Sequence, residues 1–226
     1  MRKLSKKQVQ LTALAGMIGA FLFVATFTLE GWLRPDYSAL SMYVSALSLG
    51  PRGWVQISNF ILFGLLMLAF TRGVATEFPT GKASKGGLTL LTIIALCYLF
   101  SGPFVMDPTG TTLAQSTVHG TVHGILGAIA FILMPISCFV YLRRFAIDKN
   151  WRPLWGWTLA LGAISAAGLV ALTLTSKFPQ FQSSFAAWFG LIQRALIVPF
   201  MLWLFVFALH LYRCSRTSEK EMGKTV

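Results

Sequence analysis

The sequence is short of charge: only 12% of its 226 residues are Asp, Glu, Lys or Arg, about half of the roughly 25% found in soluble domains. Acidic residues are scarcest, with seven against 19 basic ones. Such a composition excludes a disordered chain and an ordinary water-facing surface. Cysteine is also rare, and because Cys97 and Cys138 lie inside apolar segments, we expect no disulfide framework.

Long apolar segments are what the sequence has instead. They are about 20 residues long, the length that an α-helix needs to cross the roughly 30 Å hydrocarbon core of a bilayer. We therefore predict an all-α membrane protein with a single domain, residues 1–226, of six transmembrane helices. The six predicted spans are 9–32, 54–75, 88–106, 119–141, 154–175 and 187–212.

The basic residues alternate between the two sides of this predicted bundle. Fifteen of the 19 lie before span one, at or after the ends of spans two and four, or in the tail, whereas only Arg34, Arg52 and Lys177 lie in the other loops. This asymmetry places both termini in the cytoplasm of a multi-pass cell (inner) membrane protein. Because the positive charge follows the loops and no basic patch contains interleaved aromatic residues, we expect membrane lipids and no nucleic acid as partners. No protein partner is indicated.

The first outer loop contains serines at intervals of three and four, including Ser38 and Ser41. On a helix this spacing forms one narrow polar stripe, so we predict a short helix on the outer leaflet between spans one and two. Its hydroxyls could line a polar cavity and polarise a substrate. Alternatively, the small side chains let the helix pack closely on the bundle.

Two histidines open the fourth span. His119 and His123 are four residues apart and therefore share one helix face, which is how a helix offers two nitrogen ligands to zinc. Asp107, at the end of span three, could supply a third ligand and leave a position for water, as in catalytic zinc sites. The motif HGTVH lacks the glutamate of HExxH, so the general base would come from elsewhere, such as Glu30.

Arg194 lies about two turns into the last span, next to Gln193. An arginine at this depth is costly and should face a carboxylate or a cavity, and we expect Asp107 or Glu30 as its partner. Glu30, Asp107, His119, His123 and Arg194 all fall at one level beneath the outer headgroups. Their shared depth predicts a common outward-facing polar pocket.

Three interpretations of this pocket stay open. It could be a zinc-dependent hydrolase site, with Asp107, His119 and His123 as metal ligands and Arg194 stabilising an oxyanion or a lipid phosphate. It could be a lipid or solute site, or a proton pathway. It could also be a structural network in which the same groups bind one another. Gly120, Gly124 and Gly127 flank the histidines and predict a close helix approach on any of these interpretations.

The chain resembles the bacterial and archaeal integral membrane family catalogued as domain of unknown function 998. The resemblance covers most of the sequence in order and is carried by YVSALSLG, FVMDPTG followed by HGTVHG, and GLIQRALIVPFMLW. It implies a six-helix protein without an assigned activity. In the last motif the resemblance leads us to expect an acidic residue before Arg194, where this chain has Gln193.

The histidine and aspartate elements also resemble those of the zinc-dependent membrane hydrolases grouped with alkaline ceramidases, which have seven helices. On the hydrolase interpretation, the substrate would be an amide or ester of an outer-leaflet lipid. The alternative is a membrane protein that binds or transports a lipid or solute without catalysis.

Overall fold

The structure is a computed structural model that describes residues 4–78 and 82–222. The secondary structure of its described residues is all helical, with no strand, and loops connect the helices. Six long helices are present, and they are α1 (Lys6–Leu33), α2 (Gly53–Glu77), α3 (Lys82–Ser101), α4 (Val118–Ile147), α5 (Trp155–Lys177) and α7 (Phe189–Met222). The predicted spans therefore correspond one to one with these helices.

Five helical segments are long and apolar enough to cross a membrane: Lys6–Leu33, Gly53–Glu77, Val118–Ile147, Arg152–Lys177 and Gln180–Arg216. The α3 helix contributes a shorter apolar segment, Lys85–Ser101. Large apolar side chains such as Phe21, Ile132 and Val170 are exposed on the outside of the bundle, where a bilayer would cover them. The chain is a helical membrane protein.

Local signals fix where several helices begin and end. The Ser5 hydroxyl and the Gln8 side chain form a reciprocal capping box at the start of α1, which satisfies two free N–H groups. Gly102 and Pro103 follow α3 directly, and proline at 103 disfavours a helical residue before it. The predicted third span, extended to residue 106, was therefore too long at this end.

Short helical segments connect the long ones. These are η1 (Val44–Ser48), η2 (Leu113–Gln115), η3 (Arg152–Leu154), α6 (Pro179–Phe185) and η4 (Ala186–Trp188). The helix predicted between the first two spans is only the five-residue 3₁₀ turn η1, and the chain from 34 to 43 is not helical. Ser38 and Ser41 thus belong to no helix, and the predicted serine stripe does not form.

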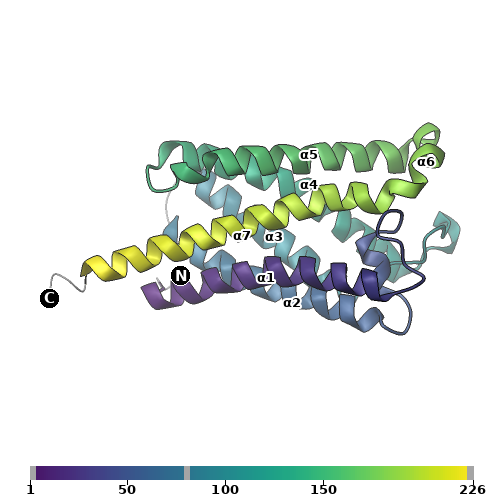
Figure 1. The fold of residues 1–226 in the computed structure, drawn as a ribbon, viewed down its shortest axis with the longest axis horizontal. Coiled ribbons are helices and arrows are strands. Elements are labelled where there is room, and N and C mark those ends of the chain that lie inside the picture. The colour runs from purple at the N-terminus through teal and green to yellow at the C-terminus, as the bar shows by residue number, and fades with distance from the viewer. Residues whose placement is uncertain (1–3, 79–81, 223–226) are drawn as a thin grey trace.

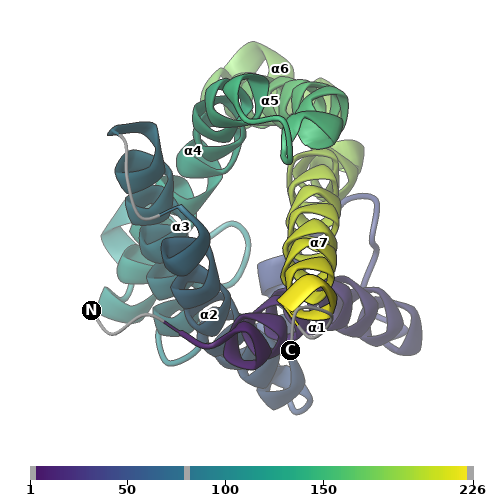
Figure 2. The same cartoon turned by 90° about the vertical axis from the view of Figure 1, so that its left-hand side faces the viewer.

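The long helices form a closed ring in chain order (Figures 1 and 2). Each packs against the next, and α7 closes the ring by packing on both α5 and α1. The loops 34–52, 102–117 and 178–188 gather at one end of the bundle, which we call the cavity end. Both termini lie toward the other end (Figure 1).

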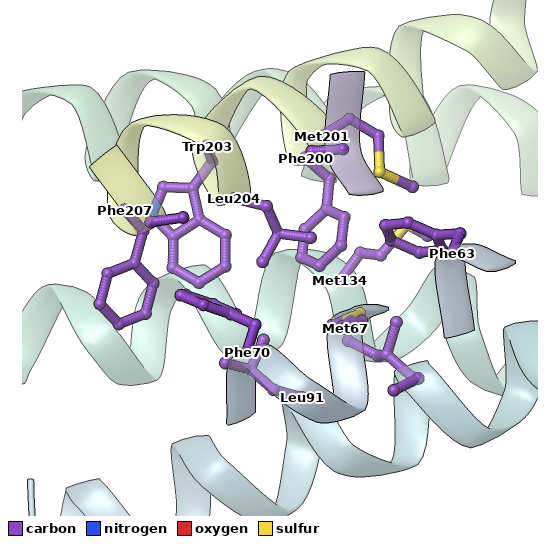
Figure 3. Packing of buried hydrophobic residues seen from close by; sticks show 14 of the residues in the cluster. Phe63, Met67, Phe70, Leu91, Met134, Phe200, Met201, Trp203, Leu204 and Phe207 are labelled. Atoms are coloured by element: carbon purple, nitrogen blue, oxygen red, sulfur yellow. The ribbon is translucent and has the colours of Figure 1, made fainter. Parts of the chain in front are cut away.

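Side chains fill the middle of the ring. Phe70, Leu91, Met134 and Phe207 come from four different helices and are fully buried against one another (Figure 3). Aromatic rings dominate this core toward the termini, where Trp151 stacks on Phe145 with centroids 5.4 Å apart. Side chains pack densely toward the termini, whereas open space lies at the cavity end and in a separate apolar groove of about 630 Å³ between α1 and α7.

Candidate functional site

A cavity of about 400 Å³ opens at the cavity end. It lies between α4, α5, α7 and the loops 34–52 and 102–117, and we call it the main cavity. Its polar lining includes Asp107, His123 and Gln193, and its apolar lining includes Phe131 and Leu172. A cavity thus lies where three of the residues predicted or noted at this level, Asp107, His123 and Gln193, come together, and its lining is both polar and apolar.

Glycines on α4 make room for the main cavity. A Cβ atom added at Gly124 or Gly127 would meet no heavy atom within 4 Å, and both residues line the cavity. The close helix approach predicted at these glycines was therefore wrong, because their missing side chains leave open space. The close approach occurs instead at Gly168 of α5, where a Cβ atom would lie 2.6 Å from the backbone nitrogen of Leu196.

Asp107 holds the start of α4. Its carboxylate accepts hydrogen bonds from the Thr117 backbone N–H (2.9 Å) and hydroxyl (2.7 Å), and the Thr117 side chain in turn accepts from the N–H of Gly120 at 3.0 Å. A carboxylate at a helix N-terminus is also favoured by the helix dipole. A Cβ atom at residue 120 would overlap the Asp107 carboxylate, so Gly120 is what lets Asp107 approach.

The two histidines share one face of α4, as their spacing predicts. Nδ1 of His119 lies 3.2 Å from the carbonyl oxygen of Pro103, and Nδ1 of His123 lies 2.7 Å from that of Phe104. Carbonyl oxygens only accept, so each Nδ1 carries a proton, and the neutral form of such a ring has its lone pair on Nε2. His119 is exposed, whereas His123 is 7% exposed.

These donors do not form a metal centre by themselves. Among residues 4–78 and 82–222, no three His, Cys, Asp or Glu side chains are grouped so that they could hold one ion. Histidines that donate Nδ1–H to a carbonyl do match the orientation of many metal ligands, but Asp107 is engaged by Thr117. The zinc site on Asp107, His119 and His123 stays a prediction.

Glu30 is buried in a cluster with two arginines, away from the main cavity. Arg52 binds both of its oxygens (2.7 and 2.8 Å), and Nε of Arg34 binds Oε1 at 3.1 Å. The hydrogen bond to Glu30 raises the pKa of Arg52. Arg34 also donates to the carbonyl oxygens of Leu47 and Leu49, so the cluster fixes the first loop to α1.

Arg194 has a different partner from the one predicted. It binds the carbonyl oxygens of Ala39, Met42 and Gly190 and the hydroxyl of Tyr37, and its guanidinium lies over the ring of Phe27, 5.5 Å from the centroid. The expected ion pair with Asp107 or Glu30 was wrong. Loop carbonyls satisfy the cation, because the carbonyl oxygens of Ala39 and Met42 belong to a non-helical loop and have no helical hydrogen bonds to make.

Ser38 and Ser41, predicted as catalytic candidates, do not line the main cavity, although Ser45 does. Sequence reasoning also missed Tyr43 as a lining residue; burial raises the pKa of Tyr43, so its phenol is a neutral group at pH 7. The missed residue with the clearest role is Gln193. Its side-chain oxygen accepts from the backbone N–H of Val44 at 2.8 Å.

The motifs that surround this cavity agree with a comparison against known families. The family profile described as "Protein of unknown function (DUF998)" matches residues 17–210. The chain belongs to this family. The DUF998 match covers all six long helices in whole or in part and confirms the resemblance seen in the sequence. No curated protein and no solved structure gave a match.

Proposed function

We propose that this DUF998 protein crosses the cell membrane six times, with both termini in the cytoplasm and the main cavity facing outward. The distribution of basic residues supports this orientation. The α3 helix, 20 residues long, is long enough to serve as the sixth span beside the five longer helices. In this orientation the cavity opens close to the outer headgroups.

We further propose that the main cavity binds an amphipathic molecule of the membrane without catalysing a reaction. The single observation that carries this proposal is a cavity of about 400 Å³ whose lining combines polar residues, among them Asp107, His123 and Gln193, with apolar ones. Sites for small ligands are typically of this size and combine apolar walls with a few fixed polar groups. An amphiphile would place its polar head against the polar side chains of the lining and its tail against the apolar ones.

Binding is favoured over hydrolysis by the contacts of the ionisable groups. Asp107 caps α4, Glu30 pairs with two arginines, and Arg194 binds loop carbonyls. These three groups, each predicted to do chemistry, therefore already have structural partners. The hydrolase interpretation requires the zinc centre, which remains a separate prediction with its own test.

Filling the cavity tests the proposed function. Gly127→Leu places a side chain in the open space without a clash at Cβ, and leucine favours a helix over glycine. Gly156→Leu is the matched control, because a Cβ atom at Gly156 also meets no heavy atom within 4 Å. Gly156 lies at the start of α5, far along that helix from the cavity residues Leu172 and Ser176.

The measurement is the lipid content of each protein after purification in mild detergent, determined by extraction and mass spectrometry. We expect the wild type and Gly156→Leu to retain about one lipid molecule per chain in the cavity, and Gly127→Leu to lose it. Equal retention by Gly127→Leu and the wild type would contradict the proposed function.

A further inference from the structure

A small recess continues the main cavity into the bundle. Its volume is about 20 Å³, which is room for about one water-sized group. The recess and the main cavity share Ser45, His123 and Gln193. A molecule in the main cavity could therefore place a single small group in the recess.

Tyr98 borders the recess with an unused hydroxyl. Its side chain is 4% exposed and lines the recess, and its ring packs edge-on against Phe23 and Phe63 with centroids 5.1 and 4.7 Å apart. Within the described part of the chain, the buried hydroxyl has no hydrogen-bond partner. Buried hydroxyls without a partner are costly and uncommon. A ligand group in the recess would therefore supply the hydrogen-bond partner that the Tyr98 hydroxyl lacks.

The polarity of the recess follows from the contacts around it. Because Val44 donates its N–H to the side-chain oxygen of Gln193, the amide nitrogen of Gln193 is left as a donor. Nδ1 of His123 lies 2.7 Å from the carbonyl oxygen of Phe104, so with the proton on Nδ1 of the neutral ring, Nε2 is an acceptor. The recess is also lined by the hydroxyls of Tyr98, Ser45 and Ser101, which can donate or accept, and by no charged side chain among the described residues.

We propose that the recess binds the hydroxyl group of a neutral amphiphile whose chain lies in the main cavity. A hydroxyl both donates, here to His123, and accepts, here from Tyr98 or Gln193. An ammonium group only donates, so it cannot accept from Tyr98 or Gln193, and a phosphate brings a negative charge into an uncharged recess. Among the described residues, Asp107 is the charged side chain that lines the main cavity, and it further disfavours an anionic head. This inference rests on the proposed binding function and names its ligand class.

Three amphiphiles with the same lauryl chain length test this selectivity: monolaurin, dodecylamine and dodecyl phosphate. Binding of radiolabelled monolaurin is measured on the full-length protein in nanodiscs, with empty nanodiscs subtracted, and the other two serve as competitors. We expect monolaurin to bind and both competitors to be about tenfold weaker or worse, because the ammonium cannot accept from the donors of the recess and both competitors would bring a charge into an uncharged space.

Two matched substitutions locate the hydroxyl site. Tyr98→Phe removes the recess hydroxyl and should weaken monolaurin binding by about threefold to tenfold, the effect of one neutral hydrogen bond. Tyr141→Phe is the control: this hydroxyl is equally buried and lacks a partner among the described residues, but Tyr141 lines neither cavity. It should leave monolaurin binding unchanged. Thermal unfolding of both variants without ligand shows that each is folded.

The outcomes separate this inference from the proposed function. Equal binding of all three amphiphiles, with no effect of Tyr98→Phe, would overturn the hydroxyl site while leaving a lipid-binding cavity. Stronger binding of dodecylamine would overturn it in favour of recognition by Asp107. A lower melting temperature of Tyr98→Phe with unchanged monolaurin affinity would also overturn it, because the Tyr98 hydroxyl would then bind a structural water molecule in the recess and not the ligand. No binding by the wild type would remove both proposals.

Discussion

Gln193 on α7 accepts a hydrogen bond from the backbone N–H of Val44, 149 residues earlier in the chain, at 2.8 Å. Its neighbour Arg194 donates to the carbonyl oxygens of Ala39 and Met42 in the same loop. Consecutive residues on a helix point about 100° apart, so the pair holds the loop at two places. The loop residues Tyr43 and Ser45 line the main cavity, and the pair therefore fixes one of its walls.

Replacing Gln193 with methionine keeps the size of the side chain and removes the acceptor. The buried N–H of Val44 would then be unpaired, and we expect the free energy of unfolding to fall by about 1–3 kcal/mol. Thermal or denaturant unfolding in detergent checks this. Leu191→Met, at a position that is 45% exposed, is the control and should change stability little. Equal stability of both variants would show that the contact is not needed.

Neutralising Glu30 should also destabilise the loop. Glu30→Gln leaves Arg34 and Arg52 next to each other without a carboxylate, and because the Arg52 side chain is 55% exposed although Glu30 is 3% exposed, we expect a loss of about 1–3 kcal/mol. Asp36→Asn changes an exposed acidic residue of the same loop and serves as the comparison in the same unfolding assay. A loss no larger than that of Asp36→Asn would argue against a structural role for Glu30.

The contact between Asp107 and Gly120 predicts that the effect of Gly120→Ala on the free energy of unfolding changes sign when the Asp107 carboxylate is removed. Gly120→Ala forces a methyl group against the carboxylate and should destabilise the protein by about 1–3 kcal/mol. In an Asp107→Ala background the obstacle is gone, and the same substitution should stabilise by up to about 1 kcal/mol through helix propensity. Unfolding of the four proteins forms a double-mutant cycle. Additive effects would mean that the two residues do not touch.

The zinc prediction is tested by elemental analysis of protein purified with zinc supplied. A centre on Asp107, His119 and His123 would hold about one zinc per chain and lose it in a folded His123→Ala variant. The binding function proposed above gives the opposite expectation, with no stoichiometric zinc in either protein. His210→Ala is the matched control, because His210 lies on α7 and contacts the carbonyl oxygen of Asn150, away from the cavity.

Much of the fold could be predicted from the sequence because each long helix satisfies its own backbone hydrogen bonds, and apolar length alone then marks a helix. The spacing of His119 and His123 was likewise enough to place both rings on one face of α4. The loop 34–52 could not be predicted in this way. Its serine spacing favoured a helix, but the carbonyl oxygens of Ala39 and Met42 bind Arg194 instead, and this contact spans more than 150 residues.

The sequence by itself determined that the chain is a membrane protein of long helices with a few polar residues at one level. Helix length and hydropathy are local properties, and each span must by itself be long and apolar enough to cross the bilayer. Only the tertiary structure decided that Glu30 binds Arg52, that Arg194 binds loop carbonyls, and that Gly124 and Gly127 border a cavity. Side-chain contacts and cavities depend on how side chains from distant segments pack together in the interior. A local sequence pattern does not contain that information.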